Sequence, residues 1–193
     1  MWLILFRKVT IGTVPTGQPP DNQLYQLVLT RPVQVVNTSS VENVITTATN
    51  SNIVRKYYLG QTAVETKNYV ALQLRTDARD QGWASQPQSG LWSWFEVAIL
   101  ATAPQSGSVV SADQIKKDAS GNLCTWVSHT IPLTNVYTEQ TGPVFDTTHP
   151  LWANLADGNV ISVLVAAQFP QWKGDVRNGD LVVQEIIDTP TTL

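Results

Sequence analysis

The sequence predicts an all-β fold, an antiparallel β-sandwich of the jelly-roll or galactose-binding-like kind. Short runs rich in β-branched and aromatic residues alternate with Gly, Pro, Asn and Ser along the chain. Helical periodicity of the apolar residues is nearly absent. Hydrophobic residues make up 42% of the 193 residues and charged residues only 14%, which is too apolar for disorder and too poor in charge for a coiled coil.

The expected strands follow this alternation, with turn residues at their ends. Pro19–Asn22 and Gln86–Gly90 are predicted loops, and Asp157-Gly158 and Asn178-Gly179 are predicted tight turns that lead into strands. Residues 103–120 are expected to form a long mobile loop with one helical turn near its middle. The predicted strands are Leu3–Val9, Leu24–Thr30, Val33–Val36, Ile53–Leu59, Tyr69–Thr76, Trp92–Ala101, Leu123–Leu133, Val160–Phe169 and Leu181–Ile187.

A single domain over residues 1–193 is expected, because β-sandwiches of this length are common. Residues 1–59 are poor in Trp and are interpreted as an N-terminal extension or as added strands, and residues 60–188 as the jelly-roll core. A separate domain of 59 residues would bury little core of its own, so one continuous fold is preferred.

Alternate residues of a strand face opposite sides, so each run divides into two faces. In the run from Leu91, one face collects Leu91, Ser93, Phe95, Val97 and Ile99, and the other collects Trp92, Trp94, Glu96, Ala98 and Leu100. The first face is predicted to be core. An ionised Glu is rarely buried without a partner, so the second face is expected to meet water or a polar groove.

The run from Tyr69 divides in the same way. Val70, Leu72 and Leu74 are predicted to face the core, and Tyr69, Ala71, Gln73 and Arg75 the other side. If the two runs are neighbours, their aromatic and polar side chains form one patch.

Such a patch suits a sugar, whose C–H face is apolar and whose rim is hydroxyl. The predicted ligand-binding residues are Trp83, Trp92, Trp94, Arg79, Gln81, Glu96, Tyr69, Gln73 and Arg75. The competing interpretation is that the paired Trp residues are packed under another segment and that Glu96 sits in a satisfied pair.

No catalytic residue, metal ligand or cofactor is predicted. His129 and His149 are 20 positions apart, and no nucleophile elbow, phosphate-binding loop or dinucleotide fingerprint is present. Asp80 and Glu96 would form a glycosidase pair only if they faced each other across a cleft. Cys124, the only cysteine, is expected to be a buried core thiol.

The charge pattern bears on partners and localisation. A net charge of -3 with no basic stripe argues against nucleic acid, and no apolar run is long enough to span a membrane. The N-terminus lacks a basic region and a cleavage site, which predicts a cytoplasmic protein, with non-classical secretion as the alternative.

Two blocks of the sequence resemble a β-sandwich domain of fungal proteins of poorly defined function. The first is Arg79–Trp83 with Gly90–Glu96, and the second is Trp126–His129 with Gly158–Val163 and Ala167–Trp172. The likeness covers about residues 55–187, and a looser one links the chain to galactose-binding-like jelly rolls. Galactose-binding-like jelly rolls bind glycans, other proteins or their own subunits, so the resemblance implies a binding role.

Three functions follow in order of expectation. The first is a non-enzymatic, lectin-like protein that binds glycans or glycoproteins. The second is a structural protein that self-associates through exposed aromatic and strand-edge surfaces into a homo-oligomer. The third is a hydrolase.

Overall fold

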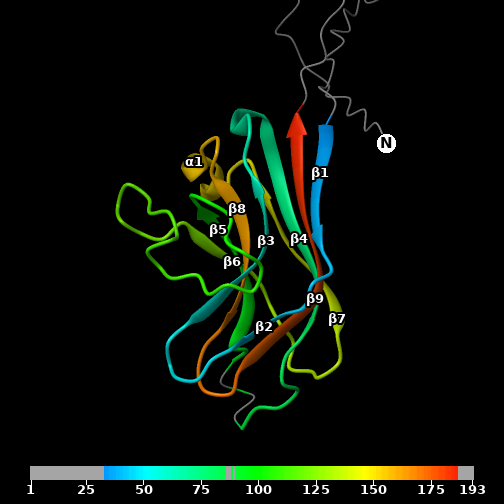
Figure 1. The fold of residues 1–193 in the computed structure, drawn as a ribbon. Coiled ribbons are helices and arrows are strands. Elements are labelled where there is room, and N and C mark those ends of the chain that lie inside the picture. Colours follow the sequence, from blue (N-terminus) through cyan, green and yellow to red (C-terminus); the bar gives the residue numbers. More distant parts are fainter. Residues whose placement is uncertain (1–32, 86–87, 89, 187–193) are drawn as a thin grey trace, which may run out of the picture.

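The computed structural model describes residues 33–85, 88 and 90–186. The strands predicted at 3–9 and 24–30 and the loop at 19–22 lie outside the described residues. Figure 1 shows two sheets packed face to face, with one short helix at their upper end. The elements are β1 (Val33–Ser40), β2 (Val44–Thr47), β3 (Val54–Thr62), η1 (Thr66–Asn68), β4 (Tyr69–Arg79), β5 (Ser93–Leu100), β6 (Thr125–Thr130), β7 (Thr138–Asp146), α1 (Pro150–Asn154), β8 (Val160–Ala167) and β9 (Lys173–Ile186).

The strand order is that of a jelly roll. One sheet, here the β1 sheet, has the order β1-β9-β4-β7, and β2 continues the line of β1 along β9. The other, the β3 sheet, has the order β3-β8-β5-β6, and all pairings are antiparallel. Successive strands repeatedly cross between the two sheets, as in a double Greek key. The predicted fold class, an antiparallel jelly-roll sandwich, is confirmed.

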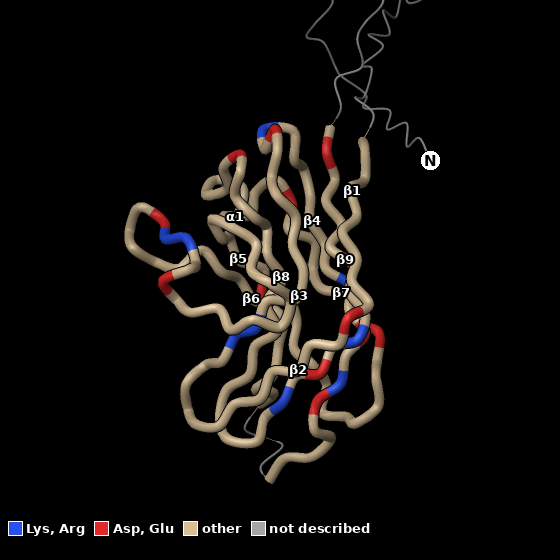
Figure 2. Tube along the Cα trace, in the orientation of Figure 1, with Lys and Arg blue, Asp and Glu red and all other residues tan. Residues whose placement is uncertain are grey.

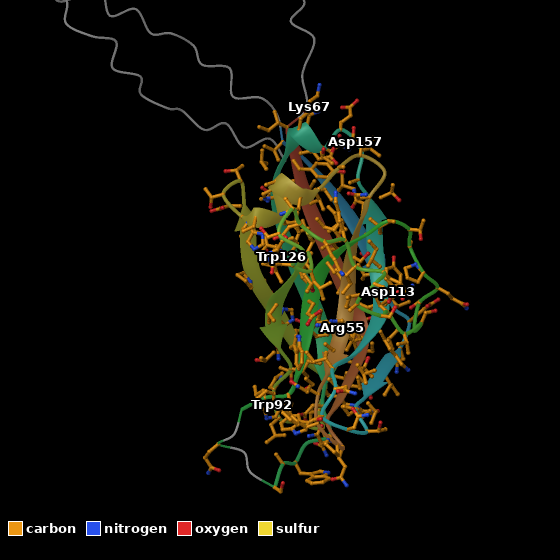
Figure 3. All side chains as sticks on the ribbon, turned by 90° about the vertical axis from the view of Figure 1, so that its left-hand side faces the viewer. Arg55, Lys67, Trp92, Asp113, Trp126 and Asp157 are labelled. Carbon is orange, nitrogen blue, oxygen red and sulfur yellow. The ribbon has the colours of Figure 1, made fainter. Side chains whose placement is uncertain are left out.

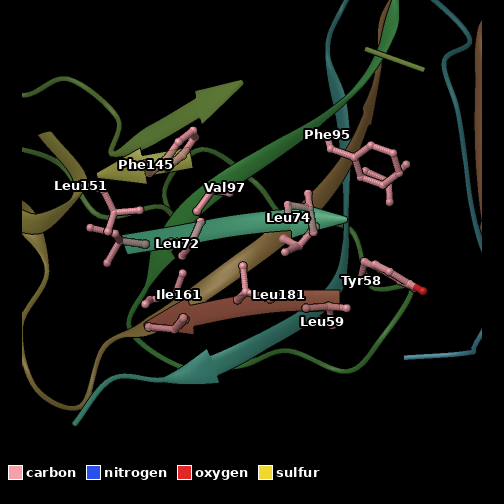
Figure 4. Close-up of a cluster of buried hydrophobic side chains, with 14 of the residues drawn as sticks. Tyr58, Leu59, Leu72, Leu74, Phe95, Val97, Phe145, Leu151, Ile161 and Leu181 are labelled. Atoms are coloured by element: carbon pink, nitrogen blue, oxygen red, sulfur yellow. The ribbon is translucent and has the colours of Figure 1, made fainter. Parts of the chain in front are cut away.

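The core lies between the sheets and follows the predicted alternation. Phe95, Val97 and Ile99 of β5 are each 0% exposed, as the sequence predicts. They share one cluster with Leu72 and Leu74 of β4, which also face inward as predicted (Figure 4). Alternation along β5 and through Leu72 and Leu74 of β4 therefore fixes these parts of the two inner faces.

The described strands that begin before residue 60 belong to this sandwich. β1 and β2 lie in the β1 sheet, and β3 pairs with β8 in the other sheet. Thr38 of β1 donates a hydrogen bond from its Oγ1 to Oε1 of Gln61 in β3, across the two sheets, at 3.1 Å. The residues described from 33 to 59 thus supply strands to both sheets.

The last strand begins earlier than expected. β9 starts at Lys173, and Asn178-Gly179, predicted to be a turn, lies inside it. The pairing with β4 shifts by one residue at Arg177, which is a β-bulge. Gly179 stands there because a Cβ at this position would lie 2.5 Å from Cε1 of Tyr58. The predicted turn at Asp157-Gly158 does precede β8.

The segment between β5 and β6 is folded onto the β3 sheet, contrary to the prediction of a mobile loop with a helical turn. Val110 and Ile115 are 3% and 2% exposed, and they pack with Tyr57, Leu100 and Leu164 on the outer face of that sheet. The backbone N–H of Tyr57 donates to the carbonyl of Ser108 at 2.9 Å. Burial of these apolar side chains gives a reason for the packing, and the segment covers part of the outer face of the β3 sheet.

Candidate functional site

The face predicted to carry the sugar is mostly buried. Trp94 and Glu96 lie on the outer face of β5 and are 8% and 4% exposed. Nε1 of Trp94 donates to Oε1 of Glu96 at 2.8 Å. The indole is therefore a packing residue that also satisfies a buried carboxylate, and it offers no open platform.

Glu96 sits in a fully bonded network. Its Oε2 lies 2.7 Å from Nε of Arg55 and accepts a hydrogen bond from Oγ1 of Thr125 at 2.9 Å. The side chains of Arg55 and Glu96 are 13% and 5% exposed. Arg55 lies midway along the sandwich in Figure 3. This arrangement matches the competing interpretation from the sequence, a satisfied pair under a packed segment.

The other two tryptophans of the prediction differ in environment. Trp92 is half-buried and meets the ring of Phe169 edge-to-face, with ring centroids 4.7 Å apart. It lies near the lower end of the molecule in Figure 3. Trp83 is 55% exposed, so it does not anchor its loop to the sandwich. A Trp83→Ala change therefore removes little buried surface.

The residues predicted on β4 belong to the other sheet. β4 and β5 are not neighbours, so Tyr69, Gln73 and Arg75 form no patch with Trp92 and Trp94. Tyr69 is 6% exposed and faces the core, because a bulge between Tyr69 and Ala71 shifts the alternation. Its ring meets that of Trp152, with centroids 5.9 Å apart. Gln73 donates to the carbonyl of Gly142 at 3.1 Å.

The segment after β4 is held by its own side chains. Oδ1 of Asp80 accepts from the N–H of Gly82 at 2.6 Å, and burial raises the pKa of Asp80. Gln81 accepts from the N–H of Lys173 at 2.9 Å and donates to the carbonyl of Trp83 at 3.0 Å. Oδ2 of Asp80 is buried and has no hydrogen-bond partner among the described residues. Glu96 is bonded within its own network on the other sheet, so the two carboxylates do not form an open pair.

His129 and Cys124, two further groups with possible chemical roles, are packed in the interior. Burial lowers the pKa of His129 to about 4, and its Nε2 lies 2.8 Å from Oγ1 of Thr76. Cys124 is 1% exposed and its pKa is raised by burial, which confirms a buried thiol. Among the described residues, no group of three or more His, Cys, Asp or Glu is placed to hold a metal ion.

On the outer face of the β1 sheet, one half carries exposed valines among mostly polar residues, and the other, the charged half, carries most of the charged residues. In register across β1, β9, β4 and β7, one row carries Val35, Gln184, Ala71 and Asp146, and another carries Ser39, Asp180, Arg75 and Thr141. Val35 and Val144 are 55% and 54% exposed. Charged residues gather toward the lower part of β9 and β7 (Figure 2).

A cluster around Tyr137 braces the charged half. The guanidinium groups of Arg79 and Arg177 lie 4.3 Å and 4.4 Å from the centre of the Tyr137 ring. Oη of Tyr137 donates to Asp175 at 2.9 Å, and Nε of Arg79 donates to the same carboxylate at 3.0 Å. Burial acts to raise the pKa of Asp175, but hydrogen bonds from Tyr137, Arg79 and Lys173 outweigh it and hold this pKa below its ordinary value.

Beside this cluster the outer face is hollowed by a depression of about 280 Å3. Asp77 is 7% exposed, and its Oδ2 accepts from Nε of Arg177 at 2.6 Å. Its Oδ1 is buried and accepts no hydrogen bond from the described residues. The lining residues are Arg75, Thr76, Asp77, Glu139, Gln140, Thr141, Asn178, Gly179 and Asp180.

Sequence reasoning found only Arg75 of this group. The depression needs β7, which the sequence does not predict, and the early part of β9, where the sequence predicts a turn. A signal existed in the alternation of Gln73, Arg75, Asp77 and Arg79 along one strand, which places four polar side chains on one face.

No family model matches the sequence. No curated protein matches it. No helix in the described ranges is long and apolar enough to cross a membrane.

Solved structures to which the chain is similar include capsid proteins. The decameric BFDV capsid protein is 11% identical with a TM-score of 0.28, over 79% of this chain and 98% of that chain. Its 60-mer form is 11% identical with a TM-score of 0.30, over 84% and 99%. The structure of infectious bursal disease virus, Gx strain, is 9% identical with a TM-score of 0.32, over 95% of this chain and 42% of that chain. With TM-scores this low, the jelly-roll assignment stands on the strand order of this chain.

Proposed function

We propose that the protein is a non-enzymatic interaction protein that associates with a second copy of itself through the outer edge of β1. The observation that supports this is an eight-residue edge strand with no charged residue and no register shift in its pairing with β9. No strand among the described residues pairs with its other edge. Long, flat, uncharged edges of this kind are templates for pairing with another chain.

The edges formed by β3, β7 and β6 are less suited to pairing than β1. β3 is covered by backbone hydrogen bonds to residues 107–110, including the N–H of Val110 to the carbonyl of Arg55 at 2.9 Å. β7 carries Glu139, Pro143 and Asp146 and contains a bulge. β6 is six residues long, with a register shift opposite Phe95 and Glu96. Charge, Pro, bulges and short length all discourage pairing, and β1 has none of these.

A second copy fits this edge by symmetry. Residues that are directly opposite in antiparallel strands share one face, so the outward-facing odd-numbered residues of β1 must pair with odd-numbered residues of the copy. A two-fold axis beside Val35 satisfies this condition. It places Val35 opposite the partner's Val35 and Val33 opposite the partner's Asn37. No like charges meet in this register, because the strand has none.

The affinity expected from one strand pair is modest. The edge buries less surface than a standard interface, so we expect a dissociation constant on the order of 10–100 μM. Sedimentation velocity over a range of concentrations measures it. The wild-type protein should shift from monomer to dimer as its concentration rises.

Two lysine substitutions provide the matched comparison. Val35→Lys places like charges on the two-fold axis and should leave a monomer. Val144→Lys alters a residue of nearly equal exposure, 54% against 55%, on the opposite edge strand of the same sheet, and should leave the dimer intact. A wild-type protein that stays monomeric up to about 1 mM overturns the proposal.

A further inference from the structure

The charged half of the β1 sheet contains a site that the proposed self-association does not use. Its depression lies over β9, β4 and β7, next to the bulge at Arg177. β1 contributes no lining residue, although Ser39 of β1 donates a hydrogen bond to Asp180 at the rim. The site and the proposed dimer edge therefore share one face of the molecule without sharing side chains.

The lining combines acceptors with donors. Asp77, Glu139 and Asp180 supply carboxylate oxygens, and Arg75 supplies a guanidinium group. Gln140, Thr141 and Asn178 add amide and hydroxyl groups that both donate and accept. A group of carboxylates alone would suit a cation, but this mixture suits a ligand with several hydroxyl groups, each of which donates and accepts.

Asp77, Asp80 and Ser93 each have one buried side-chain oxygen without a hydrogen-bond partner among the described residues, and of the three only Asp77 lines the depression. Asp77 is 7% exposed, its Oδ2 is bonded to Arg177, and its Oδ1 has no hydrogen-bond partner among the described residues. Buried carboxylate oxygens are normally hydrogen-bonded, and exceptions call for a specific explanation. A hydroxyl donor in the depression would supply the partner after a small rotation of the carboxylate.

A set of contacts around Tyr137 holds the partner of Asp77 in position. Arg177 lies over the ring of Tyr137, whose hydroxyl is fixed by Asp175. Arg79 lies over the same ring and bonds to the same carboxylate. Asp77 is thus positioned by Arg177, a residue of strand β9 whose guanidinium group is itself held in place by Tyr137. This favours a preformed site over a flexible one.

We propose that this depression binds a neutral sugar ring. A volume of about 280 Å3 lies near the lower end for small-molecule pockets, which suits one monosaccharide unit. The lining carries three carboxylates against one guanidinium, so an anionic sugar is repelled. The carbohydrate role expected from the sequence is thereby placed on other residues, with Arg75 the only member common to both sets.

Amide chemical shifts of the full chain test the site with defined probes. Galactose, glucose, mannose and N-acetylglucosamine are titrated separately to about 100 mM, with N-acetylneuraminic acid as the anionic comparison. At least one neutral sugar should shift the amides of residues 75–77, 139–141 and 178–180, and the anionic sugar should not. If none of the four neutral sugars shifts these amides, the proposal is wrong.

Conservative variants separate binding from folding. Glu139→Gln removes one exposed acceptor and should weaken the affinity for the sugar about tenfold. The amide chemical shifts of residues away from the site should stay unchanged. Asp113→Asn makes the same change in charge on the segment over the other sheet and should leave affinity unchanged. Equal affinity in the wild-type protein and Glu139→Gln would overturn the site assignment. Titration of the Val35→Lys variant should give the wild-type affinity, so failure of the dimer and failure of the sugar site are distinguished.

Discussion

Buried ionisable side chains decide which interpretation of the tryptophan face is correct. A parity argument identifies the face on which Glu96 lies but not what covers it, because the covering segment is remote in sequence. The carboxylate is bonded to Arg55, Trp94 and Thr125, so it is a structural group. Breaking a buried ion pair leaves an unpaired charge, which is more costly than the pair itself is favourable.

Glu96→Ala should therefore lower the free energy of unfolding by about 3–5 kcal/mol, because it leaves the guanidinium of Arg55 and the indole N–H of Trp94 without their acceptor. Urea denaturation measures the change. Glu139→Ala, an exposed glutamate in a strand, serves as the control and should change stability by less than about 0.5 kcal/mol. If Glu96→Ala lowers the free energy of unfolding no more than Glu139→Ala does, the buried network is contradicted.

His129 makes stability depend on pH. Burial lowers its pKa in the folded protein from 6.5 to about 4, so the unfolded chain binds the proton more readily. Above pH 6.5 the imidazole is mostly uncharged in both the folded and the unfolded protein, so it adds no pH dependence to the free energy of unfolding. As the pH falls from 6.5 toward 4, stability should fall by up to about 1.4 kcal/mol per pH unit. The difference between the wild-type protein and His129→Gln in unfolding free energy should change over that interval, and a pH-independent difference would refute the burial effect.

Strand interiors were more predictable than strand irregularities. β5 alternates without interruption toward the core, so its inner face was correct from Ser93 to Ile99. In β4 the same rule failed at Tyr69, where a bulge reverses the facing. The sequence does not predict β7, because it contains Gly142-Pro143, a pair typical of loops. In the structure these residues lie at a bulge.

The turn after β4 gives a test at the level of a loop. Gly82 and Gly107 have φ of 80° and 79°, so alanine is strained at both. A Cβ on Gly82 would lie 2.8 Å from the backbone N of Asn135, whereas one on Gly107 would meet nothing within 4 Å. Gly107→Ala should cost about 1 kcal/mol, and Gly82→Ala about 1–3 kcal/mol more. Equal melting temperatures for the two variants would show that the contact with Asn135 is not limiting.

The fold class could be predicted from the whole chain, but the site could not. Composition and turn spacing are enough to indicate a sandwich, because many short strands need closely spaced turns. The depression at Asp77 depends on the register of three strands that are distant in sequence, and a single sequence contains no direct signal of that register. The expected patch failed for the same reason, since β4 and β5 are consecutive in the chain but lie in different sheets.

Viewed as a whole, the sandwich has unequal outer faces. The segment between β5 and β6 covers part of the β3 sheet, while the β1 sheet keeps its valines and its charged depression at the surface. Pairing through β1 would join two β1 sheets edge to edge and leave both depressions on one side. Two equivalent sugar sites on one face would bind a multivalent glycan more strongly than either alone.

A cysteine at position 35 tests the pairing most directly. The two-fold register places the Cβ atoms of residue 35 in the two copies about 4.5–5.5 Å apart, close enough for a disulfide to form after a small adjustment. Cys124 is buried, so it does not compete. Under mild oxidation, Val35→Cys should form a covalent dimer, whereas Val144→Cys, equally exposed on the opposite edge, should remain monomeric. Equal cross-linking of the two variants, or none at position 35, would contradict self-association through β1.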